Sequence, residues 1–160
     1  MDNYLLDADD YKAMSLTNTN VEDSIVRVTI QRGQRHVLQP VLTKPLYERL
    51  LQGVEDDDLN SDEVILLERY IQPYLACECD RKILNNVTYQ IRNKALNKGT
   101  DQYANPVNES ENLRLDNSIR SDIEASRKLL IDYLIENKDF FPEYVVDCKP
   151  TDYTQNIGFI

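Results

Sequence analysis

Apolar side chains recur at helical spacing in two long segments, and this pattern restricts the fold more than any other feature. The first segment follows Asn60 and contains Val64, Leu67, Tyr70, Ile71, Tyr74 and Leu75. Residues three and four apart share one face of an α-helix, so the spacing predicts an amphipathic helix through Leu84. Asn60 and Glu63 have the spacing of a capping box at its start. Pro73 predicts a kink near residues 69–72, because proline cannot donate a backbone hydrogen bond.

The second segment predicts a helix from about Asp116 to Lys138 that stops before Pro142. Its apolar positions form one stripe, with spacings near multiples of four: Leu115, Ile119, Ile123, Leu130 and Leu134. Two amphipathic helices of this length indicate a helical body with one buried face on each helix.

Residues 21–38 are the first helix candidate, because Asn20 and the acids that follow it resemble a helix N-terminus. A strand is the competing interpretation, since Val26, Val28 and Ile30 are β-branched and alternate with polar residues. The length of the segment and its cap favour the helix.

Proline, glycine and acidic residues mark the connections. Pro45 suits the first turn of a short helix over residues 45–52 that Gly53 closes. The acids of residues 55–58 then form a solvated loop, and residues 99–113 form another.

Residues 87–97 admit two interpretations. Apolar and polar residues alternate there, and residues 92–94 have the polar character of a turn, which favours a β-hairpin that projects from the helical body. The alternative is a helix that continues to Lys98.

We therefore expect a mainly α fold, a small bundle of about four helices, with a β-hairpin insertion near residues 87–97 and an extended C-terminal tail. Residues 1–19 form an N-terminal arm with one short helical turn at residues 8–14. Residues 20–144 form the helical domain, and residues 145–160 form the tail.

The charge balance opposes direct nucleic-acid binding, because 28 acidic residues against 18 basic ones give a formal charge of -10. The longest apolar runs, such as residues 64–67, are far below the roughly 20 residues that span a bilayer, so no membrane partner is expected. Three cysteines without a signal peptide indicate a cytosolic protein with reduced thiols.

No catalytic, cofactor-binding or metal-binding site is expected. His36 is the single histidine, and the end of a helix accounts for it. Cys77 and Cys79, two residues apart, point in different directions on a helix. Asp56, Asp58 and Asn60 match the first three ligand positions of a calcium loop, but Ser61 stands in place of its glycine and Leu67 in place of its bidentate glutamate.

The ten tyrosines are more informative, because tyrosine combines a large contact area with a polar tip and is common at protein interfaces. Most of them are expected at the edge of the core. The interface candidates lie outside the long predicted helices or in the apolar tail: Tyr4, Tyr11, Tyr103, Tyr153, Ile157, Phe159 and Ile160.

Three phrases resemble neck proteins of tailed bacteriophages, including the crAss-like group. They are VLQPVLTKPLYERL from Val37, LERYIQPYLA from Leu67 and YQIRNK from Tyr89. That family has a "PLLG..LY..L" phrase, then "YIQP.LA", and then a hairpin-like "YKI.NKG". Two positions depart from it: Thr43-Lys44 stands where the family often has Leu-Gly, and Ala95 where it often has Gly.

The resemblance covers roughly residues 20–140. It implies a subunit of a dodecameric head-tail connector ring, assembled in the host cytoplasm and carried in the virion between the portal and other neck or tail ring proteins. DNA would pass through the channel of such a ring without specific binding. An acidic helical regulator that binds a basic host protein is the alternative, and a small hydrolase is a third option.

Overall fold

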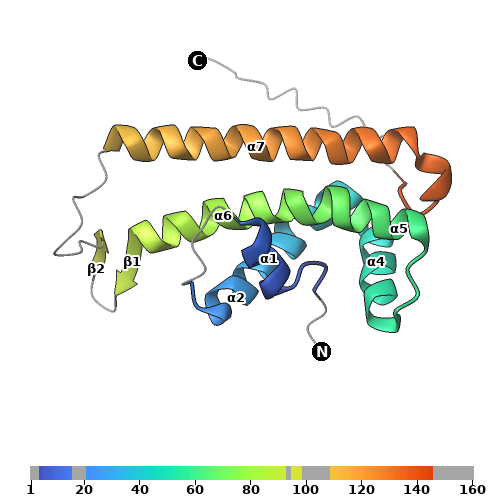
Figure 1. Ribbon diagram of the computed structural model, residues 1–160, viewed down its shortest axis with the longest axis horizontal. Helices are drawn as coiled ribbons and strands as arrows, with labels where there is room; N and C mark the ends of the chain where they lie inside the picture. Colours follow the sequence, from blue (N-terminus) through green and yellow to red (C-terminus); the bar gives the residue numbers. More distant parts are fainter. Residues whose placement is uncertain (1–3, 16–20, 93–94, 99–108, 146–160) are drawn as a thin grey trace, which may run out of the picture.

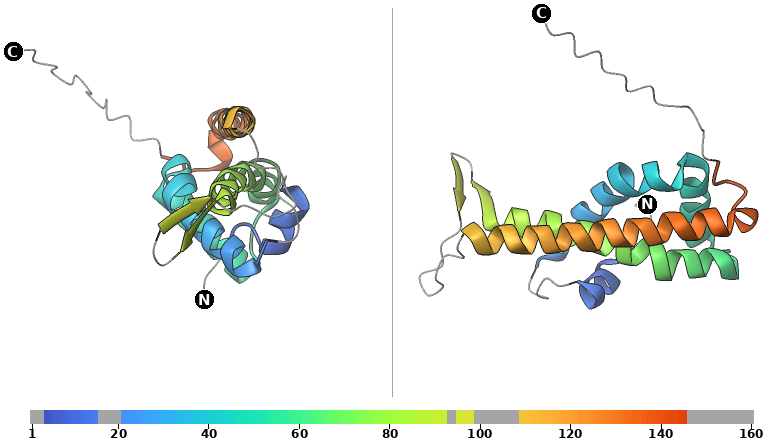
Figure 2. Two further views of the ribbon diagram at one scale, coloured as in Figure 1. Left: turned by 90° about the vertical axis from the view of Figure 1, so that its left-hand side faces the viewer. Right: turned by 90° about the horizontal axis from the view of Figure 1, so that it is seen from above.

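Two long helical segments run antiparallel and side by side along the molecule (Figures 1 and 2). The computed structural model describes residues 4–15, 21–92, 95–98 and 109–145, and within them the fold is mainly α, as predicted. The first segment consists of α5 (Ser61–Leu66), the π-helical turn η2 (Leu67–Ile71) and α6 (Gln72–Thr88). The second is α7 (Glu109–Glu136), followed by the 3-10 turn η3 (Lys138–Phe140).

The start of α5 confirms the predicted capping box. The Asn60 side chain accepts hydrogen bonds from the backbone amides of Asp62 and Glu63, each at 2.9 Å. The Glu63 carboxylate accepts the Asn60 amide at 2.8 Å. Three amides that a helix cannot pair internally are thus satisfied by neighbouring side chains.

Two π-helical turns precede prolines, and one of them is the predicted irregularity before Pro73. The turn η2 ends two residues before Pro73, and η1 (Gln34–Leu38) ends two residues before Pro40. A proline ring clashes with the carbonyl four residues earlier and offers no N–H, so a locally widened turn accommodates it. Both helical paths therefore continue through their prolines.

Residues 23–38 are helical, which settles the competition between helix and strand. The N-cap is Glu22, which forms no side-chain cap hydrogen bond, whereas the predicted cap, Asn20, lies outside the described residues. The elements are α2 (Asp23–Gly33), η1, α3 (Gln39–Leu42) and α4 (Lys44–Asp56). Val26 and Ile30 are buried whereas Val28 is exposed, as a period of four residues requires. The Thr29 hydroxyl donates to the Ile25 carbonyl at 2.7 Å, so this β-branched polar residue is satisfied within the helix.

The end of α4 differs from the prediction that Gly53 closes the helix. Gly53 is buried inside α4, and the helix continues to Asp56. Asp57 adopts the left-handed conformation instead, with φ 54°, which aspartate tolerates better than most residues. The acids at positions 55 and 56 therefore belong to the last turn of α4 and not to a loop.

Thr43 separates α3 from α4 with an unusual backbone, φ 67° and ψ 155°. Its hydroxyl donates to the carbonyl of Glu143 at 3.2 Å. This corner therefore contacts the chain just beyond the end of α7.

The N-terminal segment packs into the body and does not form a separate arm over residues 4–15. The helix α1 (Ala8–Met14) was predicted, but Leu5 and Leu6 before it are buried. The Leu5 amide donates to the side chain of Gln34 at 2.7 Å, and the Leu5 carbonyl accepts from Gln72 at 3.1 Å. Gln34, the first residue of η1, and Gln72, the residue after η2, thus hold the backbone of Leu5 in place.

The β-hairpin at the end of α6 confirms the favoured interpretation of residues 87–97. Strand β1 (Tyr89–Arg92) pairs antiparallel with β2 (Ala95–Lys98), in a register that sets Tyr89 opposite Lys98 and Arg92 opposite Ala95. In Figure 1 the hairpin lies at the end of the molecule opposite α4 and α5.

The core lies between α6 and the helices around it. Its largest fully buried side chains come from every part of the described chain and include Tyr11, Ile30, Leu42, Leu50, Leu66, Ile71, Tyr74 and Phe141. The helix α7 contributes a stripe to this core with Ile119, Ile123, Leu130 and Leu134, as the sequence predicts. The prediction was wrong for Leu115, which is 46% exposed. Its opposite face is exposed to solvent.

Candidate functional site

Three large apolar side chains are exposed where α7 ends. They are Ile135, Phe140 and Val145, with exposed fractions of 57%, 59% and 58%. We call them the C-terminal apolar patch. All three belong to residues 135–145, which close the helical body, and their exposure makes this segment a candidate binding surface. The patch immediately precedes residues 146–160, the predicted tail.

The chain under this patch is firmly anchored. The rings of Tyr70 and Tyr133 stack with centroids 4.1 Å apart, and Tyr133 meets the buried ring of Phe141 at 6.1 Å. Stacked and tilted aromatic pairs at these distances are attractive. Phe140 points outward from a segment whose next residue is fixed in the core.

An ion pair fixes the opposite end of α7 to α6. Arg81 donates from Nε to Asp116 at 2.9 Å, and Arg120 donates to the other Asp116 oxygen at 2.7 Å. These hydrogen bonds, that from Arg81 above all, hold the pKa of Asp116 below its usual range. The aromatic stack and this ion pair therefore join α7 to the body near both ends.

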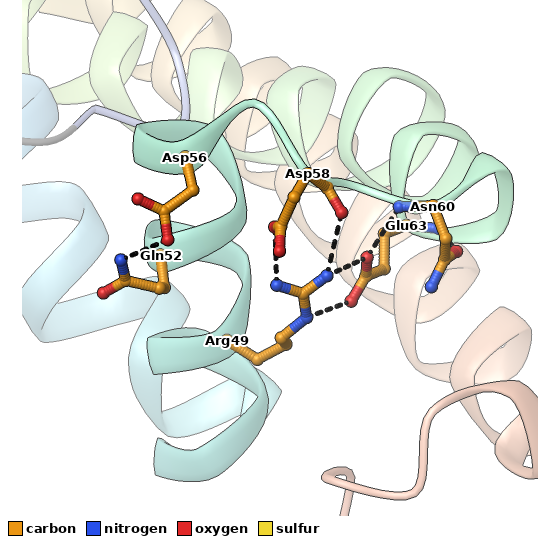
Figure 3. A network of polar contacts seen from close by, with 6 residues as sticks. All are labelled: Arg49, Gln52, Asp56, Asp58, Asn60 and Glu63. Carbon is orange, nitrogen blue, oxygen red and sulfur yellow. Dashed lines mark hydrogen bonds and ion pairs between the residues drawn. The ribbon is translucent and has the colours of Figure 1, made fainter.

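A second polar network fixes the turn between α4 and α5 (Figure 3). Arg49 donates to both oxygens of Glu63, at 2.8 and 2.9 Å, and also to the Asp58 carboxylate and carbonyl, at 2.8 and 3.1 Å. Glu63 is 4% exposed, so the bidentate contact lies largely away from water. Asp58 lies in an exposed loop, as predicted, and its carboxylate also pairs with Arg49.

The structure places only two of the predicted interface residues within the described ranges. Tyr4 is half-buried and packs against the core. Tyr11 is 1% exposed and its hydroxyl donates to the buried Asp80 at 2.6 Å, so the expectation of a Tyr11 interface is corrected. The remaining candidates lie outside the described residues: Tyr103, Tyr153, Ile157, Phe159 and Ile160.

The C-terminal apolar patch was not predicted, although the sequence contains a signal for it. Phe140 and Phe141 are adjacent, and two neighbouring side chains rarely both face one core. The sequence therefore indicates that one of these two phenylalanine side chains is exposed unless a partner covers it.

The cysteines and the histidine that were considered for catalysis or metal binding do not form a site within the described residues. Burial raises the pKa of the Cys79 thiol to about 12, and it also raises the pKa of half-buried Cys77. His36 is exposed in η1. Within the described ranges no three histidine, cysteine or acidic residues are grouped as metal ligands would be. None of the helices described is long and apolar enough to cross a membrane.

A protein-family model matches residues 38–154, and its description is "Family of unknown function (DUF6712)". The chain belongs to this family. The DUF6712 region begins at the end of η1, includes α3 to α7 with the hairpin, and continues past the C-terminal apolar patch into the predicted tail. No curated protein and no solved structure matches the chain.

Proposed function

We propose that this chain is a subunit of the neck ring that joins the portal to the tail in a tailed bacteriophage. The observation that carries the proposal is the C-terminal apolar patch, three exposed apolar side chains on an anchored segment directly before the tail. An assembly subunit needs such a surface, since burying apolar area is the main source of association free energy.

The shape of the subunit supports the same role. A helix of 28 residues such as α7 is about 42 Å long at 1.5 Å per residue. It runs antiparallel to α6, with the hairpin at one end and the patch at the other (Figure 1). An elongated subunit with different features at its two ends suits a ring that contacts one neighbour above it and another below it.

The resemblance to phage neck proteins is the other reason for the proposal, and the DUF6712 match, whose description gives no function, overlaps the same part of the chain. The region shared by the family includes the patch and reaches residue 154, so it is not restricted to the helical body. The resemblance to phage neck proteins rests on phrases that lie in α3, α4, η2, α6 and β1. In this proposal the ring is dodecameric, and DNA passes through it without specific binding.

The test combines negative-stain imaging of the full chain, alone and with the portal protein, with two single variants. Phe140→Ser should reduce association with the ring or portal at least tenfold, because a side chain of this size contributes about 1.5–3 kcal/mol when buried. Leu129→Ser is the matched control, since Leu129 is 61% exposed on α7 outside the patch. Both variants should melt within a few degrees of the wild type.

Deletion of residues 151–160 should likewise reduce association and leave the helical circular dichroism unchanged. A variant with the same ten residues in scrambled order controls for length and charge. If the full chain remains monomeric both alone and with the portal, the proposed function is wrong.

A further inference from the structure

Charge is strongly segregated along the chain. Residues 24–47 contain four basic residues, Arg27, Arg32, Arg35 and Lys44, and no acidic residue. Residues 48–68 contain eight acids and one base, Arg49. A chain of net charge -10 therefore has a basic region and a strongly acidic region next to each other in sequence.

The basic region forms one exposed helical face on α2 and η1. Ile25, Val28, Arg32 and Arg35 are separated by three, four and three residues, a spacing that places them on one side of a helix. All four are exposed, with Ile25 at 41% and Val28 at 49%. The opposite side of α2 is buried in the core. We call these four residues the basic face.

The basic face has the composition of a protein interface, because two apolar side chains lie beside two guanidinium groups. Arginine is enriched at interfaces and the buried core of an interface is more apolar than the rest of the surface, whereas a surface that contacts only phosphates does not need exposed aliphatic residues. Among the described residues, no carboxylate forms an ion pair with Arg32 or Arg35.

The acidic region contains a complementary surface at the end of α4. Glu55, Asp56 and Asp57 are exposed there and lie at the C-terminus of the helix. The helix dipole disfavours negative charge at that end, although Gln52 donates a hydrogen bond to the Asp56 carboxylate at 2.6 Å (Figure 3). We call them the acidic corner. Half-buried Val54 and Leu59 lie next to it in the chain.

The two surfaces lie on different parts of the subunit, with the basic face on α2 and the acidic corner at the end of α4 (Figure 1). Contacts between two different surfaces of identical subunits are heterologous, and they generate rings when the rotation closes. We propose that the basic face of one subunit docks on the acidic corner of a second copy of this chain. This inference rests on the proposed ring and specifies which surfaces form it.

Charge complementarity favours this occupant over an unrelated one. Two subunits of charge -10 repel each other overall, so association requires local attraction at the contact. The docked surfaces would supply it. The attraction is salt-dependent, because raising the salt from about 0.1 M to about 1 M shortens the Debye length from about 10 Å to about 3 Å.

The experiment measures the oligomeric state of the full chain by sedimentation velocity and native mass spectrometry. The double variant R32E/R35E should dissociate into monomers at concentrations where the wild type is oligomeric. The matched control is R114E/K128E, which introduces the same charge change at two exposed basic residues of α7 outside the C-terminal apolar patch and should leave assembly unchanged.

Charge reversal on both surfaces separates a lost contact from a damaged fold. The variant E55K/D56K alone should also be monomeric, and the combination R32E/R35E/E55K/D56K should assemble again. High salt should weaken the wild-type oligomer severalfold.

Different failures have different meanings. If R32E/R35E forms rings as the wild type does, the assignment of these surfaces is wrong and the ring proposal stands. If the same variant loses affinity for duplex DNA in fluorescence anisotropy while assembly is unchanged, the basic face is a nucleic-acid surface and the inference is overturned. A wild type that is monomeric alone but joins a ring on the portal would also overturn it, because the two surfaces would then be insufficient.

Discussion

Replacing Arg49 with methionine should destabilise the protein, because it leaves the buried Glu63 carboxylate without its main partner. Removing one member of a buried ion pair usually costs about 3–5 kcal/mol. Here the Arg49 side chain is 27% exposed, and Glu63 keeps the Asn60 amide at 2.8 Å. We therefore expect a smaller loss, about 2–3 kcal/mol. In a chain of this size it would lower Tm by about 4–12 °C.

The measurement is thermal unfolding followed by circular dichroism, with K44M as the matched control on the same helix. Lys44 lies 3.5 Å from Glu48, but both side chains are mostly exposed, so K44M should shift Tm by less than about 2 °C. A double-mutant cycle isolates the interaction. R49M/E63Q should be more stable than the sum of the two single changes predicts, since it leaves no unpaired charge.

Two results would refute this reasoning. One is an R49M variant that melts within about 2 °C of the wild type, which would mean that water solvates Glu63 adequately. The other is strict additivity in the cycle, which would mean that Arg49 stabilises α4 through contacts other than Glu63.

Two further predictions follow from the pKa shifts. Because Arg81 lowers the pKa of Asp116, this pair contributes stability at neutral pH that is lost as pH falls below about 4, through the lowered pKa. R81M should therefore lower Tm at pH 7 but much less at about pH 2, and equal differences at both pH values would contradict the assignment. Cys79, with a pKa of about 12, should resist iodoacetamide at pH 8 in the folded protein and react after denaturation, as read from the mass of its peptide. Equal labelling rates in both states would show that the thiol is accessible.

Local signals predicted much of the fold. The capping box at Asn60 and Glu63 acts within one helical turn, and the widened turn before Pro73 follows from the proline itself. The helix over α2 was predicted from the length of its segment and from a cap at Asn20, but the cap lies outside the described residues and Glu22 is the N-cap. These features depend on residues that are neighbours in sequence.

The packing of the N-terminal segment could not be predicted in the same way. The Leu5 backbone is bound by Gln34 and Gln72, which are 29 and 67 residues away. Nothing in the local sequence distinguishes a glutamine that binds a remote amide from one that faces water. Tyr11 was misassigned for the same reason, since its hydroxyl pairs with Asp80, 69 residues away.

The candidate surfaces show a second limit. The net charge indicated an acidic molecule. However, basic side chains are exposed on α2 and η1 and acidic ones at the end of α4, so the basic face is visible only in the distribution of charge along the chain. The start of α7 was also placed too late, at Asp116 instead of Glu109, although Glu109 and Glu111 are acids of the kind that favour a helix N-terminus. The basic residues of α2 and the acids at the start of α7 are both visible in the sequence. They were missed because the charge was considered for the whole chain and residues 99–113 were considered as one loop.

Thr43 has a backbone conformation that glycine adopts almost exclusively, and such a conformation costs about 1–3 kcal/mol in other residues. Its side chain nevertheless binds the Glu143 carbonyl, two residues before the last described residue, Val145. This hydrogen bond therefore joins the strained corner between α3 and α4 to the chain just beyond α7, so two segments 100 residues apart in sequence constrain each other.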